Sequence, residues 1–190
     1  MTTPEVLSPS DVRLVLSTYR DVLRSHQDVV NRLNVYPVPD GDTGTNMALT
    51  IESVVAGLDG LEDPVTMSTV CHAISHGSLM GARGNSGVIL SQLLRGMAER
   101  FREFDVVDAA VLGSALAHAD DLARKAVVRP IEGTILSVAR AAAVGAAESL
   151  DRGGDLAATA EAARSAAEVA LAYTPEQLPA LKQALSLIHI

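Results

Sequence analysis

Aromatic residues are scarce in this chain, which has no Trp, two Phe and three Tyr among its 190 residues. The hydrophobic fraction of 48% is nevertheless ample for a sizeable core, so Ala, Leu and Val must do most of the packing. A composition rich in alanine and poor in aromatics favours helices over a β-sandwich.

Cysteine is almost absent as well. The single cysteine, Cys71, cannot form an internal disulfide, which fits a reducing compartment, and we expect a cytoplasmic protein. Cys71 lies within a helical pattern, so we expect it to be buried as a small hydrophobic residue.

Three further absences narrow the possible location and partners of the protein. No run approaches the roughly 18 apolar residues of a membrane-spanning helix, so we expect no membrane insertion. The first six residues, Met-Thr-Thr-Pro-Glu-Val, lack the basic start and apolar stretch of a signal peptide. Clustered positive charge is also missing, and the net charge of −8 argues against nucleic acid as a partner.

Most of the sequence shows apolar residues at helical spacing. Apolar residues between Val12 and Leu33 follow steps of three and four, which predicts an amphipathic helix with Ser10 as its N-cap. Pro64 suits the first position of a later helix. Glycine and proline divide the chain into further helical segments, expected at about 45–58, 64–80, 88–101, 108–127, 134–150 and 155–172, with a last one from near Pro175. No strand-like alternation of useful length interrupts them, so the fold class is all-α.

The two ends of the chain differ from the rest. We expect residues 1–9 to form a flexible N-terminus and residues 10–184 to form one domain. The last six residues, Leu185-Ser-Leu-Ile-His-Ile190, break the preceding composition. They match an in-frame translation of a transposon-end adapter used in sequencing libraries, so residues 185–190 are expected to be a non-native tail of a truncated gene.

The most informative stretch is Asp40-Gly-Asp42, which places two carboxylates on a loop just before a helical pattern. Mg²⁺ prefers oxygen ligands and takes one or two carboxylates beside substrate phosphates. A following helix N-terminus favours anions. Gly41 lets the backbone fold so that both carboxylates converge on one metal or a metal pair. The alternative is an Asp-Gly turn with a helix cap. Thr43, Thr45 and Asn46 can cap that helix, bind phosphate, or do both.

A second glycine-rich break spans residues 81–87 and offers backbone donors for a phosphate. An ordinary helix–helix turn explains it equally well, because Asn85 and Ser86 are also good N-caps. Arg83 can supply positive charge to a phosphoryl group, or it can be a solvated surface residue. A third break, residues 129–134, precedes another helix that Thr134 is well placed to cap.

These three segments carry a family resemblance. Residues 34–47 (Asn-Val-Tyr-Pro-Val-Pro-Asp-Gly-Asp-Thr-Gly-Thr-Asn-Met), residues 81–92 (Gly-Ala-Arg-Gly-Asn-Ser-Gly-Val-Ile-Leu-Ser-Gln) and residues 130–134 (Pro-Ile-Glu-Gly-Thr) closely resemble the DhaL domain. More narrowly, they resemble the N-terminal kinase domain of the fatty acid kinase FakA (YloV-like) group. DhaL is also the ATP- or ADP-binding part of dihydroxyacetone kinases. The resemblance covers about residues 10–184.

The resemblance implies an antiparallel barrel of about eight helices, here with an incomplete last helix, that holds ATP or ADP in loops at one end. It implies two Mg²⁺ ions bound by acidic residues that Asp40 and Asp42 match. Asn34 stands near the position of a further aspartate, with the spacing differing by one residue. Catalysis would rest on Asp40, Asp42 and Arg83. The positions that match nucleotide-binding residues are Thr43, Gly44, Thr45, Asn46, Gly84, Asn85, Ser86, Gly87 and, near the base, Thr134.

The resemblance also implies a function: transfer of the γ-phosphoryl group of ATP to a fatty acid held by a separate fatty-acid-binding protein of the FakB type. A carboxylate acceptor is already ionised at pH 7 and needs no general base. Two alternatives stay open, a dihydroxyacetone (glycerone) kinase domain and a nucleotide-binding regulatory domain without turnover. Further C-terminal domains, absent from this chain, would allow a homodimer.

Overall fold

The computed structural model describes residues 4–188, and the side chains of residues 4–183. Residues 1–3 of the expected flexible N-terminus and residues 189–190 of the expected tail lie outside the described residues.

Within residues 4–188 eight helices make up the fold, which confirms the all-α class. Their bounds are α1 Pro9–Arg32, α2 Thr43–Asp59, α3 Met67–Gly81, α4 Gly84–Phe101, α5 Ala109–Lys125, α6 Ile135–Asp151, α7 Leu156–Gln177 and α8 Pro179–Ile188. The bounds that the sequence pattern predicts lie within a few residues of these for the central helices. Among residues 4–188, no helix has the length and hydrophobicity needed to cross a bilayer.

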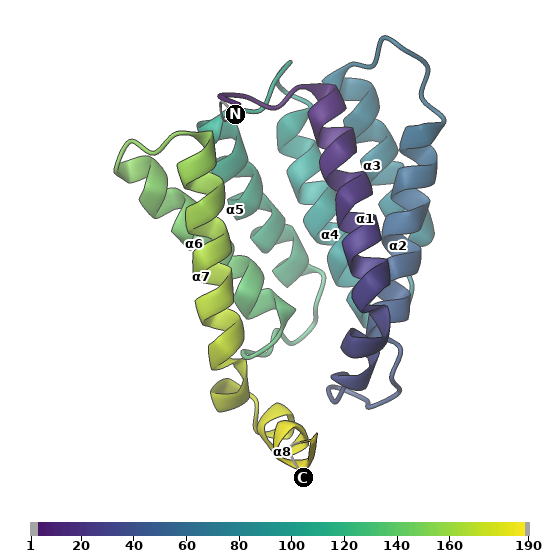
Figure 1. The fold of residues 1–190 in the computed structure, drawn as a ribbon, viewed down its shortest axis with the longest axis vertical. Helices are drawn as coiled ribbons and strands as arrows, with labels where there is room; N and C mark the ends of the chain where they lie inside the picture. Colours follow the sequence, from purple (N-terminus) through teal and green to yellow (C-terminus); the bar gives the residue numbers. More distant parts are fainter. Residues whose placement is uncertain (1–3, 189–190) are drawn as a thin grey trace.

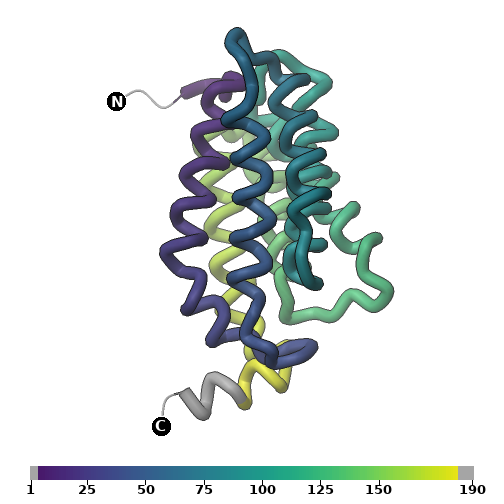
Figure 2. The backbone as a smooth tube through the Cα atoms, turned by 90° about the vertical axis from the view of Figure 1, so that its right-hand side faces the viewer, coloured from purple at the N-terminus to yellow at the C-terminus, as the bar shows by residue number. Residues whose placement is uncertain are grey.

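Successive helices run antiparallel, and each packs against the next from α1 to α8 (Figure 1). The helices therefore curve around a common interior, with α1 and α7 at the two ends of the series. Within the described part of the chain α1 and α7 make no contact, so the ring is open between them. The antiparallel order places the N-termini of α2, α4 and α6 at one end of the bundle, the end where α8 also lies (Figures 1 and 2).

The main core is formed by side chains of the helices from α1 to α5. The most deeply buried of these side chains come from α2 and α3. Ile51, Val54 and Val70 have no exposed surface. Cys71 is also buried, as predicted, and burial raises the pKa of its thiol to about 12. Aliphatic side chains dominate this core, in keeping with the scarcity of aromatics.

The first helix begins earlier than predicted. Ser8, not Ser10, is the N-cap: its hydroxyl accepts a hydrogen bond from the Asp11 backbone N–H, and the Asp11 carboxylate accepts one from the Ser8 backbone N–H. This is a capping box with Pro9 in the first turn. Leu7 pairs with Val107 through two backbone hydrogen bonds of 2.8 and 2.9 Å. Residues 7–9, expected to belong to a flexible segment, thus join the fold.

Two proline positions also differ from the prediction. Pro64 precedes α3 instead of starting it, because Thr66 forms a capping box with Thr69 and sets the first turn at Met67. Pro175 lies inside α7, and α8 begins only at Pro179. A proline has no N–H for the carbonyl four residues before it. The Thr174 hydroxyl donates to that carbonyl of Leu171 at 2.8 Å, which lets the helix continue.

Candidate functional site

The loop between α1 and α2 brings Asn34 and Asp40 together. Asn34 Nδ2 donates to Asp40 Oδ1 at 2.6 Å, and Asp40 remains exposed to solvent. Gly41 has a φ of 70°, the left-handed conformation that the sequence predicts for a fold between the two aspartates. One amide and one carboxylate therefore stand side by side at the entrance to α2.

Asp42 occupies the N-cap position of α2, but its carboxylate makes no capping hydrogen bond. Its backbone carbonyl accepts from the Asn46 N–H at 2.8 Å and starts the helix. The side chain that caps comes from another helix: Asn31 Oδ1 of α1 accepts the Thr45 N–H at 3.1 Å. Because Asn31 satisfies this amide, the Asp42 carboxylate is not used as a cap.

Thr45 and Gly44 face α1. The Thr45 hydroxyl accepts hydrogen bonds from Asn31 Nδ2 at 3.0 Å and from Gln27 Nε2 at 3.1 Å. Gly44 is buried against the Gln27 backbone carbonyl, where a Cβ atom would clash. Both residues thus fix the first turn of α2 on α1. Their predicted contact with nucleotide stays a prediction.

The second glycine-rich break is tighter than predicted, since α4 begins at Gly84 with Arg83 at the N-cap position. Asn85 and Ser86 therefore lie in the first turn, and their prediction as N-caps is wrong. The Gly87 N–H already donates to the Arg83 carbonyl at 3.0 Å. The Arg83 guanidinium is exposed and folds back on α3, donating to the carbonyls of Met80 at 3.1 Å and Ala82 at 2.8 Å.

The α1–α2 loop and the α3–α4 break contact each other. Ser86 Oγ donates to the Thr43 carbonyl at 3.3 Å, and Gly84 lies against the Asn46 side chain. Thr50, buried beneath them, donates to the carbonyls of Asn46 at 2.7 Å and Gly81 at 3.3 Å. The N-termini of α2 and α4 are thereby joined at one end of the bundle. Two adjacent helix N-termini favour an anion through their free N–H groups and their dipoles.

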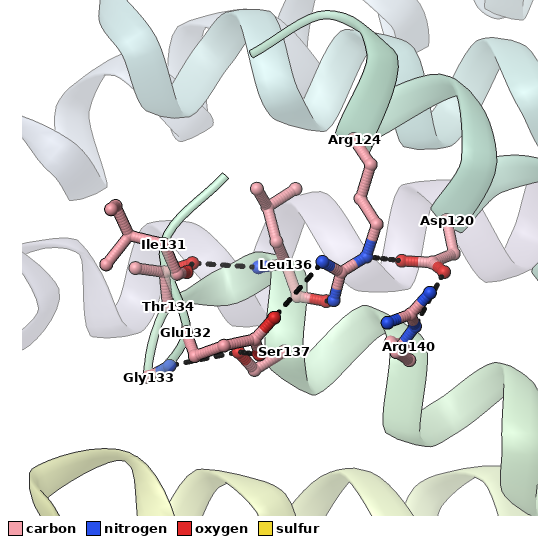
Figure 3. A network of polar contacts seen from close by, with 9 residues as sticks. All are labelled: Asp120, Arg124, Ile131, Glu132, Gly133, Thr134, Leu136, Ser137 and Arg140. Carbon is pink, nitrogen blue, oxygen red and sulfur yellow. Dashed lines mark hydrogen bonds and ion pairs between the residues drawn. The ribbon is translucent and has the colours of Figure 1, made fainter. Parts of the chain in front are cut away.

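The third break lies at the same end of the bundle, between α5 and α6 (Figures 1 and 2). Thr134 is the N-cap of α6, as predicted: its hydroxyl accepts from the Leu136 N–H at 3.3 Å. The same hydroxyl donates to the Ile131 carbonyl at 2.8 Å (Figure 3). Its second predicted role, near a nucleotide base, stays a prediction.

The donor chemistry fits a hard cation. As metal ligands Asn34, Asp40 and Asp42 can offer only oxygen atoms, and they lie in the loop that leads into α2. Nowhere in the described residues do three or more His, Cys, Asp or Glu side chains form a group that could hold a metal ion by themselves. Mg²⁺ commonly binds with one or two carboxylates and completes its shell with water and phosphate oxygens. These residues therefore fit Mg²⁺ better than a metal that requires a full protein cage.

Two side chains that sequence reasoning missed are Gln27 and Asn31. They are four residues apart on α1, so they lie on one face of that helix, just ahead of the Asp40-Gly-Asp42 motif. This pair of polar residues on one helix face is the sequence signal from which their role at the loop could be predicted. A groove of about 680 Å³ lies between α6 and α7, and it includes no residue of the first two motifs.

Comparison with known proteins identifies a family and several bacterial relatives. The family model of the DAK2 domain matches residues 37–188. Protein YloV of Bacillus subtilis is 45% identical over 161 residues, which are 85% of this chain and 29% of that protein. Uncharacterized protein SSP1546 of Staphylococcus saprophyticus is 44% identical over 163 residues, again 85% of this chain and 29% of the relative. Uncharacterized protein SH1689 of Staphylococcus haemolyticus is 45% identical over the same length, with the same shares.

The chain thus spans less than a third of the curated relatives it matches. The matched region contains the Asp40-Gly-Asp42 loop, the α3–α4 junction and the α5–α6 loop, which lie at one end of the helical bundle. The chain belongs to the DAK2 (DhaL) domain family of nucleotide-binding, kinase-type domains.

Proposed function

We propose that this domain binds ATP with Mg²⁺ and transfers the γ-phosphoryl group to the carboxylate of a fatty acid. A separate fatty-acid-binding protein of the FakB type would present that acid. The observation that carries the proposal is the junction of the α2 and α4 N-termini, with Asn34, Asp40 and Asp42 in the loop that leads into α2.

In this proposal Asp40 and Asp42 hold Mg²⁺, and Asn34 contributes its amide oxygen. Asn34 Nδ2 already donates to Asp40 and can fix its carboxylate, and the amide oxygen of Asn34 stays available for the metal. Bound Mg²⁺ would neutralise phosphate charge, which is most of what phosphoryl transfer requires of its surroundings. The family leads us to expect two ions.

The first turns of α2 and α4 would bind the phosphates. Their backbone N–H groups and the Thr43 hydroxyl would be the donors, and the side chains of Asn46 and Asn85 flank the junction. The Ser86 hydroxyl would join them only by leaving the Thr43 carbonyl. Arg83 would take part only by leaving the Met80 and Ala82 carbonyls, which an exposed arginine can do at little cost. The α5–α6 loop, with Thr134, would lie beside the nucleoside.

The acid–base groups support a carboxylate acceptor. The His118–Glu99 pair, at 2.8 Å, includes a carboxylate near the end of α4 that lies farthest from Gly84. It is therefore a poor base for a hydroxyl acceptor bound at the loops. A fatty acid carboxylate is ionised at neutral pH and needs no base, whereas a sugar hydroxyl would benefit from one.

One experiment tests the proposal against its rivals. The domain is incubated with Mg-ATP and either a FakB-type protein carrying oleate or dihydroxyacetone with its binding subunit, and ADP release is measured. Release only with the acyl carrier supports the proposal, and release only with the sugar subunit supports a glycerone kinase. Tight ADP binding without turnover in either mixture would indicate a regulatory domain.

A further inference from the structure

We propose that Arg124 is a positioning residue for nucleotide binding, because its guanidinium fixes the α5–α6 loop in place. The inference rests on the proposed function, since it assumes that nucleotide binds at the end of the bundle where this loop lies. Arg124 itself would not touch the nucleotide.

The guanidinium of Arg124 bridges three parts of the chain (Figure 3). Its Nε donates to Asp120 Oδ1 at 2.9 Å, one turn earlier in α5. Nη1 donates to Glu132 Oε1 in the loop at 3.3 Å, and Nη2 donates to the Leu136 carbonyl in the first turn of α6 at 3.3 Å. A planar fork with fixed donors can hold three acceptors at once, whereas a lysine cannot.

The Asp120 end of this bridge is rigid. The side chains of Arg124 and Asp120 are only 16% and 13% exposed, so solvent screens the pair weakly. Arg140 of α6 also reaches Asp120, with its Nε 3.6 Å from Oδ2. Two arginines therefore face two carboxylates, Asp120 and Glu132, and the cluster is close to electrically neutral. It offers no spare positive charge to a phosphate.

At its loop end, Glu132, the bridge is linked to the loop backbone by further hydrogen bonds. Glu132 Oε2 accepts from the Ser137 hydroxyl at 2.5 Å, and that hydroxyl accepts from the Gly133 N–H at 2.9 Å. Behind Gly133, a Cβ would lie 3.0 Å from the Leu178 backbone nitrogen and from the Thr174 carbonyl. Arg124 and Glu132 thus hold the loop on one side, and the end of α7 supports it on the other.

The chemistry of the loop indicates which part of a nucleotide it can meet. The Gly133 N–H and the Thr134 hydroxyl are already engaged within the loop. The side chains of Val128 and Ile131 are exposed, at 98% and 37%. Apolar surface suits the flat face of a base better than it suits phosphate. A loop that shifts should therefore weaken binding of ATP while leaving binding of bare polyphosphate intact.

The test compares two ligands on the wild type and on variants of two arginines. Calorimetry measures the affinity of Mg-ATP and of Mg-tripolyphosphate for the wild type, for Arg124→Gln, and for Arg164→Gln as the matched control. Arg164 also bridges two carboxylates, those of Glu161 and Glu168, but on the exposed surface of α7.

Loss of charge-assisted hydrogen bonds in Arg124→Gln should weaken Mg-ATP binding about tenfold or more, with tripolyphosphate affinity and helicity unchanged. Arg124→Lys should recover little, and Arg164→Gln should match the wild type. Glu132→Ala removes only the loop end of the bridge, so it replaces Arg124→Gln if that variant does not fold. Unchanged Mg-ATP affinity in a folded variant, or equal loss for both ligands, would overturn the inference. A wild type that does not bind Mg-ATP would instead overturn the proposed function on which the inference rests.

Discussion

Gly84 lies so close to the side chain of Asn46 that a Cβ atom at residue 84 would overlap with Asn46 Nδ2. This contact joins the first turn of α4 to the first turn of α2. Gly84 also has a φ of 57°, which side chains other than glycine rarely adopt. The junction of the two helix N-termini therefore depends on a residue that lacks a side chain.

Replacing Gly84 with alanine should destabilise this junction in two ways. The left-handed backbone costs about 1–2 kcal/mol for an L-residue, and the Asn46 side chain must move as well. Gly153→Ala is the matched control, because Gly153 has a φ of 76° and no atom lies within 4 Å of the place that its Cβ would take. Urea unfolding should show the strain in both variants, whereas loss of Mg-ATP affinity should appear only in Gly84→Ala. Equal nucleotide affinity in the two variants would remove the junction from the binding site.

Asn31→Ala should destabilise the start of α2. The substitution removes the acceptor for the Thr45 N–H and a donor to its hydroxyl, and loss of a cap costs about 1 kcal/mol. For a domain of this size that is a fall in Tm of about 2–4 °C. Gln27→Ala removes only the hydrogen bond to the Thr45 hydroxyl, so its effect on Tm should be smaller. A larger fall in Gln27→Ala would contradict the assignment of Asn31 as the cap.

The sequence was most predictive where local chemistry decides the structure. Helical spacing and glycine-bearing breaks predicted the helices, and Thr134 was identified as a cap from its position alone. The signal for the true start of α1 was also present: Ser8 is followed by a proline and, three residues later, by Asp11. Ser10 was the poorer choice because it lacks that pattern.

Prediction failed where a residue from another segment decides the outcome. Thr43, Thr45 and Asn46 are possible caps by sequence, but all three lie inside α2, and Asn31 of α1 does the capping. Pro175 looks like a helix start, but the Thr174 hydroxyl satisfies the carbonyl that the proline leaves without a donor. The bridge from Arg124 to Glu132 crosses a loop whose path the sequence pattern does not define.

Asp40→Asn should sharply weaken Mg-ATP binding and leave the fold intact. Asp40 is exposed, and an asparagine oxygen can still accept from Asn34, so helicity and Tm should hardly change. The loss should be about tenfold or more with Mg²⁺ and should vanish when EDTA removes the ion, since the charge is needed for the metal. Glu5→Gln, an exposed acid near the other end of α1, is the control. Unchanged Mg-ATP affinity in Asp40→Asn would exclude Asp40 from the metal site.

Cys71 should resist alkylation in the folded protein. Its side chain is buried, and burial raises the pKa of the thiol to about 12, so at pH 8 roughly one thiol in ten thousand is ionised. Mass spectrometry after iodoacetamide treatment at pH 8 should show an unmodified folded protein and complete labelling in 8 M urea, because each molar of urea lowers the unfolding free energy of a small domain by roughly 1–3 kcal/mol. Fast labelling without urea would mean that α3 opens readily.

The bridge at the α5–α6 loop should weaken in acid. The Ser137 hydroxyl, together with the Arg124 guanidinium, holds the pKa of the Glu132 carboxyl below its ordinary value of 4.5. A carboxyl with a lowered pKa in the folded state stabilises that state above pH 4.5, and its contribution is lost as pH falls through the folded-state pKa. The difference in unfolding free energy between the wild type and Glu132→Gln should therefore be constant from pH 7 to about 5 and then shrink toward pH 3. Urea unfolding at each pH measures this difference.

In a Ser137→Ala background the same difference should be smaller throughout, because the main partner of the carboxylate is gone. A difference that grows toward pH 3 would mean that the protonated carboxyl, not the carboxylate, holds the loop.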